Sequence, residues 1–99
     1  MKLLENFSFI DSDGKMWTAP KGEIVDGSSI PRWAWSIIGS PFVGEHRNAS
    51  VIHDVFCRFR IETDNATHEM YIEAIKVSGV GKFKSKLMKT ALKIGAPKW

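Results

Sequence analysis

Along the first quarter of the chain, apolar and polar residues alternate, as they do in strands with one face in a core. Phe7–Ile10 and residues 15–18 both show this pattern, and the Asp11-Ser12-Asp13-Gly14 segment between them supplies a turn with a residue that accepts positive φ. A β-hairpin is therefore predicted here. Residues 23–25, which follow a second turn, are predicted as a short third strand.

After residue 30 the apolar positions recur at three- and four-residue steps, which is typical of amphipathic helices. Ser28 or Ser29 is expected to cap the first of these helices, and Gly39-Ser40-Pro41 to end it. Residues 42–46 and 58–64 are expected as connections. The predicted helices cover residues 32–38, 49–58, 67–78 and 82–94. Because strands precede helices, the sequence predicts one α+β domain over residues 1–99, with a small antiparallel sheet of two to three strands packed with three to four helices.

Composition supports a folded protein: 43% of the 99 residues are hydrophobic and 25% are charged. A single cysteine, Cys57, excludes an internal disulfide and suits a reducing compartment. Glu5 interrupts the apolar start of the chain, so no signal peptide is expected, and no apolar stretch approaches the length of a membrane span.

Charge is distributed unevenly. Residues 1–73 carry seven Lys and Arg against eleven Asp and Glu, whereas residues 74–99 carry seven Lys and no acid. This segment is expected to face an anionic partner, or to be only a solvated helix face. The lysines that share one face of the last helix are Lys82, Lys86, Lys89 and Lys93. No nucleic-acid motif accompanies them, so no specific readout of nucleic acid is expected.

The pair His53-Asp54 is the main candidate for chemistry. His53 follows Ile52 and is expected at the edge of the apolar stripe, partly sheltered, where its ring needs partners or acts as a general base. Asp54 lies about 100° further round the helix, so it does not orient His53 and is free to bind a cation or cap another segment. The candidates for the orienting group are Asp26, Asp64, His68 and Glu69.

A second candidate is the segment from Asp26 to Trp35. Ser28, Ser29 and Arg32 stand at a predicted helix start, where amides and a guanidinium would suit a phosphate or carboxylate. Asp26 would otherwise hold Arg32, which makes the segment a structural clasp. Ser29 is not expected to be a nucleophile, because no G-x-S-x-G setting surrounds it.

Metal binding has little support in the spacing of ligand-type residues. His46, His68, Asp54 and Asp64 match no metal signature, and with one cysteine any zinc site would need mostly His and carboxylate ligands. No cofactor is assigned.

Several segments of the chain together resemble a domain-of-unknown-function family of tailed phages and prophages. They are Asp26 to Arg32 with Trp35, His53-Asp54, residues 71–74, Gly79-Val80 and the closing residues 95–99. The resemblance covers residues 22–99. It implies a phage or prophage origin, and hence host cytoplasm or virion, but no established activity. Members usually hold an Asp three residues before the aromatic matched by Tyr71; here that residue is His68.

The helix bearing His53 is also similar to the active-site helix pair of phospholipases A2. That likeness implies His53 as base, Asp54 as calcium ligand and Asp64 or His68 as orienting group, although the calcium-loop glycines and disulfides of those enzymes are missing.

Three functions follow as hypotheses. The first is a binding or virion and tail accessory protein that docks a phage structural or host protein, with the Asp26–Arg32 and His53-Asp54 segments forming a structural clasp. The second is a small hydrolase with His53 as general base. The third is a nucleic-acid-directed host-takeover factor, which rests on charge alone.

Overall fold

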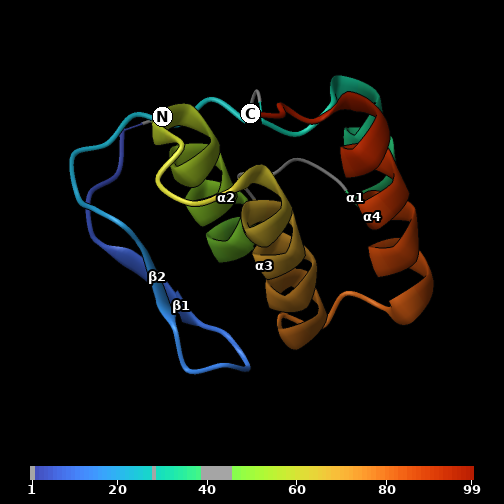
Figure 1. Ribbon diagram of the computed structural model, residues 1–99, viewed down its shortest axis with the longest axis horizontal. Coiled ribbons are helices and arrows are strands. Elements are labelled where there is room, and N and C mark those ends of the chain that lie inside the picture. The colour runs from blue at the N-terminus through green and yellow to red at the C-terminus, as the bar shows by residue number, and fades with distance from the viewer. Residues whose placement is uncertain (1, 28, 39–45) are drawn as a thin grey trace.

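A short hairpin lies on one side of a central pair of helices, and a third long helix lies on the other side (Figure 1). The computed structural model describes residues 2–27, 29–38 and 46–99. The α+β prediction is confirmed. The elements, in chain order, are β1 (Phe7–Ile10), β2 (Met16–Ala19), the 3-10 turn η1 (Arg32–Ala34), α1 (Trp35–Ile38), α2 (Arg47–Phe59), α3 (Asp64–Val77) and α4 (Lys82–Gly95).

The hairpin has its predicted turn. Asp11 organises that turn: its Oδ1 accepts the backbone N–H groups of Asp13 and Lys15, and its Oδ2 accepts the indole N–H of Trp17. Gly14 has a φ of 82°, which favours glycine. The strands pair antiparallel with Phe9 opposite Trp17, and Trp17 is buried against α2.

The prediction of a third strand is wrong. Ile24 forms one antiparallel bridge to Lys2, and residues 23–25 make no further ladder in the described part of the chain. Ile24 is 56% exposed while Val25 is buried, so this segment is a loop with one anchoring side chain rather than a strand.

The helix α2 begins at Arg47, two residues before the predicted start, and all of its residues from 49 to 57 are buried. The hairpin packs on one side of α2 and α3 on the other, which explains burial around the whole helix. His53 is therefore 0% exposed rather than partly sheltered at the edge of a stripe. Phe59 is 52% exposed because it lies in the last turn of α2.

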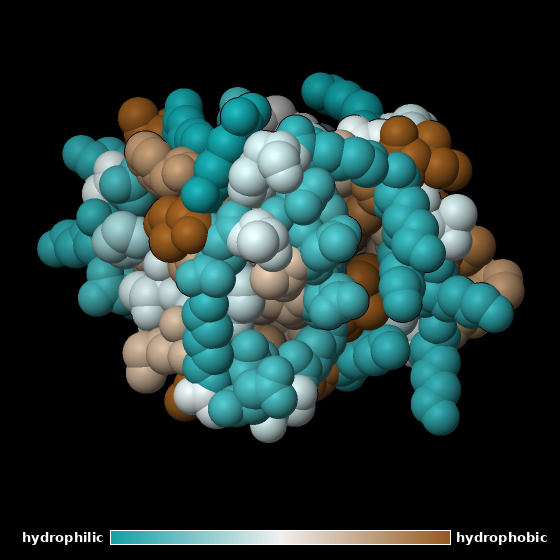
Figure 2. Space-filling view, in the orientation of Figure 1, coloured by the Kyte–Doolittle hydropathy of each residue, from teal (hydrophilic) through white to brown (hydrophobic). Residues whose placement is uncertain are grey.

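The helix α3 begins three residues earlier than predicted, because the side chain of Thr63 caps it by accepting the N–H of Ala66 at 3.1 Å. The helix α4 matches its prediction to within a residue, but its apolar residues divide between two faces. Met88, Ala91 and Leu92 are buried, whereas Phe83 and Ile94 are mostly exposed. Figure 2 shows hydrophilic residues over most of this view, with small hydrophobic patches toward both its left and its right side.

None of the helices in the described ranges is long and apolar enough to cross a membrane. The C-terminal end of the chain lies close to the loop before η1 (Figure 1), where Gly95 packs directly against Pro31.

Candidate functional site

Asp54 ties the loop before η1 to the middle of α2. Its Oδ2 accepts the backbone N–H of Asp26 at 3.1 Å, and its Oδ1 accepts the N–H of Ser29 at 3.4 Å. Gly27 has a φ of 76° between these two contacts, and the N–H of Ile30 donates to the Gly27 carbonyl at 3.1 Å. The loop thus turns around one buried carboxylate, which fixes the side chain of Ser29 over α2.

That side chain starts a line of hydrogen bonds through the protein. Ser29 Oγ lies 3.1 Å from His53 Nδ1, and His53 Nε2 lies 2.8 Å from His68 Nδ1 on α3. His68 Nε2 lies 3.0 Å from the carbonyl oxygen of Pro97. We call the three side chains Ser29, His53 and His68 the relay.

The carbonyl at the end of the relay determines where the protons are. A carbonyl only accepts, so His68 Nε2 must carry a hydrogen, which leaves Nδ1 of neutral His68 as an acceptor. His53 Nε2–H then donates to His68, and His53 Nδ1 is left with a free lone pair that faces the hydroxyl of Ser29. The arrangement is that of a serine with its base and a group that orients the base.

Burial keeps this base neutral. Desolvation, together with the charge that His68 would carry, lowers the pKa of His53 to about 3. Burial also lowers the pKa of His68, while the Pro97 carbonyl and Asp64 act in the opposite direction. The ring of Tyr71 packs 4.8 Å from that of His53 and closes the other side. Both imidazoles are neutral at pH 7.

Cys57 lies beside the relay, one turn along α2 from His53. Its sulfur is 3.6 Å from His53 Nε2 and 3.8 Å from Nδ1. Burial, with the carboxylates of Asp54 and Asp64, raises the pKa of Cys57 to about 12, and the hydroxyl of Ser29 offsets part of this rise. The group is a thiol at neutral pH rather than a reactive thiolate.

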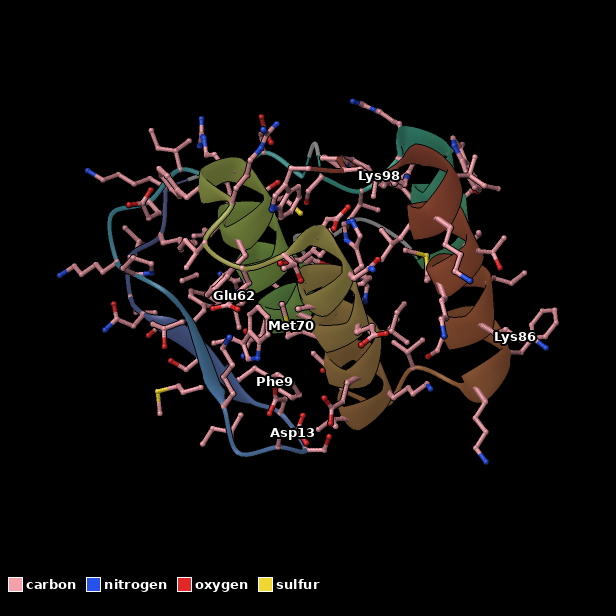
Figure 3. The ribbon with its side chains drawn as sticks, viewed as in Figure 1. Phe9, Asp13, Glu62, Met70, Lys86 and Lys98 are labelled. Atoms are coloured by element: carbon pink, nitrogen blue, oxygen red, sulfur yellow. The ribbon has the colours of Figure 1, made fainter. Side chains whose placement is uncertain are left out.

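The relay runs between two cavities. Its Ser29 end borders one of about 280 Å³, which Arg58 and Arg60 also line. Its His68 end borders one of about 360 Å³ between α3 and α4, lined in part by Lys89 and Lys93. Lys98, another residue of that second cavity, extends beside the C-terminal end of α4 (Figure 3). Two acidic residues, Asp26 and Asp54, line the first cavity together with the two arginines, so its lining carries both signs of charge.

Five of the residues singled out in the sequence come together here: Asp26, Ser29, His53, Asp54 and His68. Asp64 does not orient His53. Its Oδ2 accepts the backbone N–H of Trp99 at 3.4 Å, and it acts on His68 only through its charge.

Arg32 and the lysines lie outside the relay, although Lys89 and Lys93 border the cavity at its His68 end. The guanidinium of Arg32 stacks 4.9 Å from the ring of Trp35 on the exposed face of η1 and has no hydrogen bond to His53 or Asp54 among the described residues. Ser28 lies outside the described residues. Ser29 does not cap η1; Pro31 is the cap residue, without a side-chain bond, because the Ser29 hydroxyl turns to His53. The four lysines, Lys82, Lys86, Lys89 and Lys93, are exposed on α4, and Lys86 points outward in Figure 3.

Two residues of the site, Cys57 and Pro97, were not predicted from the sequence as parts of it. Cys57 follows His53 by four residues, a spacing that puts both on one helix face and could have marked it. Pro97 joins through its carbonyl, 29 residues from His68, and no local pattern marks such a contact.

Comparison with known proteins places the chain within a family. Residues 1–92 match the family model described as "Protein of unknown function (DUF1353)". Uncharacterized protein y4jT of Sinorhizobium fredii is 43% identical over 98 residues, and uncharacterized protein y4iH of the same bacterium is 34% identical over 99 residues. Each alignment covers 99% of this chain, which spans only 29% and 41% of the length of these relatives. No solved structure matches. The chain therefore belongs to the DUF1353 family.

Proposed function

We propose that the chain is a small hydrolase in which Ser29 is the nucleophile and the Nδ1 atom of His53 is the general base. The observation that carries this proposal is the relay itself: Ser29 Oγ lies 3.1 Å from Nδ1 of His53, and Nε2 of the same ring lies 2.8 Å from Nδ1 of His68. A nucleophile, a base and an orienting group in hydrogen-bond sequence are the parts that acyl transfer requires.

The reaction on an ester would proceed in two steps. Ser29 Oγ attacks the carbonyl carbon as its proton passes to His53 Nδ1, and the carbon–oxygen bond to the leaving group breaks as His53 returns that proton to the departing alkoxide. Water then attacks the acyl-serine and gives a proton to His53. The acyl–oxygen bond breaks, and Ser29 recovers its hydrogen.

The cavity around Ser29 indicates the class of substrate. The N–H of Ser29 is already bonded to Asp54, so it does not serve a developing oxyanion. Arg58 and Arg60 border the same cavity together with Asp26 and Asp54, so a carboxylate or phosphate of the substrate would bind on the arginine side, away from the two acids. Ser29 itself is only 3% exposed, so productive binding requires the loop from Asp26 to Ile30 to open slightly.

A fluorophosphonate probe tests the proposal without knowledge of the substrate, because it phosphonylates serine hydroxyls that a base activates. Peptide mapping should find the label on Ser29. His53→Gln should slow labelling by about 100-fold or more, and Ser29→Ala should abolish it. Ser36, whose hydroxyl donates to the Trp33 carbonyl rather than to a histidine, provides the control Ser36→Ala, which should label like the parent. Folded protein that leaves Ser29 unlabelled at high probe concentration contradicts the proposal.

A second candidate is a binding or accessory protein in which the same residues are only a clasp. The burial of Ser29 and His53 and the two backbone bonds to Asp54 favour this candidate. The lysine face of α4 would then contact an anionic surface of a phage structural or host protein. A phage or prophage origin, and a site of action in host cytoplasm or virion, have support only from the resemblance of the sequence signature.

The two candidates differ in their response to substitution. Partner association that weakens with salt, survives Ser29→Ala and is lost when Lys82, Lys86, Lys89 and Lys93 become Gln would favour the accessory protein. Association that Ser29→Ala abolishes in a folded variant would contradict it.

A further inference from the structure

We propose that His53, Cys57 and His68 form a site for a divalent transition-metal ion of the zinc type, and that metal binding and the hydrogen-bonded relay are alternative states of the same residues. The ligand atoms of the three side chains all lie within 4.8 Å of one another. Two of them come from one face of α2 and the third from α3, so packing of the two helices assembles the site.

Metal binding requires His68 to shift, because one of the three ligand distances already matches a tetrahedral centre while Cys57 Sγ lies up to 4.8 Å from the His68 nitrogen. Bonds of about 2.05 Å to nitrogen and about 2.3 Å to sulfur place those atoms ~3.6 Å apart at a tetrahedral angle, and two such nitrogens ~3.4 Å apart. Cys57 Sγ lies 3.6 Å from His53 Nε2, which already fits. The two histidine nitrogens, at 2.8 Å, must separate by ~0.6 Å. His68 is only partly buried beside its cavity, and this leaves room for that shift.

The remaining nitrogen of each histidine also has a partner suited to metal binding. Ligating imidazoles usually donate their other N–H to a carbonyl, carboxylate or similar acceptor, which fixes the ring. His68 Nε2 already donates to the Pro97 carbonyl at 3.0 Å. His53 Nδ1 faces Ser29 Oγ at 3.1 Å, and that oxygen can accept a hydrogen once Nε2 binds a metal.

The electrostatic setting favours a cation at the sulfur. Asp54 and Asp64 both impose negative potential on Cys57. A metal ion would be attracted by the same field and would displace the thiol proton to solvent. Two imidazoles and one thiolate suit Zn²⁺ or Co²⁺ better than Mg²⁺ or Ca²⁺, which prefer oxygen ligands, and leave a fourth position for water.

A metal would change the chemistry of the relay, a consequence that rests on the proposed function. With Nε2 bound to the ion, the proton of neutral His53 must reside on Nδ1, so His53 no longer accepts the proton of Ser29. Zinc would therefore act as an inhibitor of Ser29.

The test is a titration of the full chain, purified metal-free in a reductant that does not bind metal, with Co²⁺. We expect one equivalent to produce the visible bands of tetrahedral cobalt and a thiolate-to-cobalt charge-transfer band, and Zn²⁺ to remove both. Cys57→Ser should lose the charge-transfer band, and His68→Gln should bind at least about 10-fold more weakly. His46→Gln, which changes the histidine outside the cluster, should bind like the parent. No binding, or binding that Cys57→Ser leaves unchanged, overturns the proposal.

X-ray absorption of the zinc-loaded parent protein needs no variant. One sulfur at about 2.3 Å together with nitrogen ligands at about 2.0–2.1 Å is expected, and a shell without sulfur overturns the assignment. Fluorophosphonate labelling separates this proposal from the hydrolase. Zinc binding without any labelling of Ser29 contradicts the hydrolase alone, and labelling without metal binding contradicts the metal site alone.

Discussion

His53 Nε2 and His68 Nδ1 lie 2.8 Å apart, so a neutral imidazole takes the place that a carboxylate commonly has behind a catalytic histidine. The neutral ring of His68 accepts the hydrogen bond from His53 Nε2–H as a carboxylate in its place would, and it thereby keeps the hydrogen of His53 on Nε2. It stabilises the imidazolium that forms during proton transfer less than a carboxylate does, because it carries no charge. His53 is therefore held in a fixed orientation but is a weak base.

Replacing His68 with an acidic residue should make His53 a stronger base. The Nδ1 atom of histidine and an Oδ atom of aspartate are both two bonds from Cβ, so His68→Asp should keep the hydrogen bond to His53 and add a negative charge. We expect the pKa of His53 to rise and labelling of Ser29 by fluorophosphonate to increase by about 10-fold or more. His68→Asn, which keeps the acceptor without the charge, is the matched control and should resemble the parent. Equal labelling of the two variants would contradict the electrostatic argument.

Acid should destabilise the protein through His53. Its pKa is about 3 in the folded state and about 6.5 when unfolded, so between these values only the unfolded chain takes up the proton. The free energy of unfolding should therefore fall as pH decreases from about 6.5, by at most about 1.4 kcal/mol per pH unit for this group. His68 contributes in the same direction.

Urea unfolding at a series of pH values measures this slope. His53→Gln should flatten it between pH 6 and pH 4, relative to the parent, because glutamine does not titrate. A parent protein whose stability is constant over this range would show that His53 is protonated in the fold, or exposed.

The Asp54 carboxylate should matter more for stability than for proton transfer. Asp54→Ala leaves the N–H groups of Asp26 and Ser29 without their acceptor, and we expect a loss of about 2–3 kcal/mol in the free energy of unfolding. Glu5→Ala, at an exposed acidic residue, should change it by less than about 0.5 kcal/mol. Chemical denaturation compares the two, and equal stabilities would show that the loop is held by other contacts.

Gly95 tests the junction between the C-terminal segment and the loop. A Cβ atom there would lie 2.7 Å from Cγ of Pro31, so Gly95→Ala should cost about 1–3 kcal/mol and displace the loop that carries Ser29. Gly81→Ala is the matched control, since a Cβ there meets nothing within 4 Å, and should alter stability by no more than about 0.5 kcal/mol. Thermal unfolding of both variants checks the difference; equal melting temperatures would contradict this packing.

Local patterns predicted most of the fold. The alternation in Phe7–Ile10 and the helical spacing after residue 46 identified the hairpin and the three long helices, because both depend on neighbours a few residues away. The prediction of a third strand was wrong because residues 23–25 form a single bridge, between Ile24 and Lys2, and no ladder among the described residues. The depth of His53 also escaped prediction, because it results from the hairpin and α3 packing on opposite sides of α2.

The candidate site was predicted in part. The sequence suggested that the Asp26–Arg32 segment meets His53-Asp54, and Ser29 and the Asp26 backbone do so. Arg32 does not, because its guanidinium has a nearer partner in the ring of Trp35. Ser29 was set aside as a nucleophile for want of a local motif. Its position depends on backbone bonds to Asp54, 25 residues away, which no motif encodes.

The proton positions in the relay are the most direct test of this account. Long-range ¹H–¹⁵N NMR at neutral pH, on metal-free protein, distinguishes the two neutral tautomers of each histidine and the charged form. We expect both His53 and His68 to be neutral and to carry their hydrogen on Nε2, with Nδ1 of His53 free to accept from Ser29. A hydrogen on Nδ1 of His53, or a charged ring at this pH, would contradict the assignment of His53 as the base.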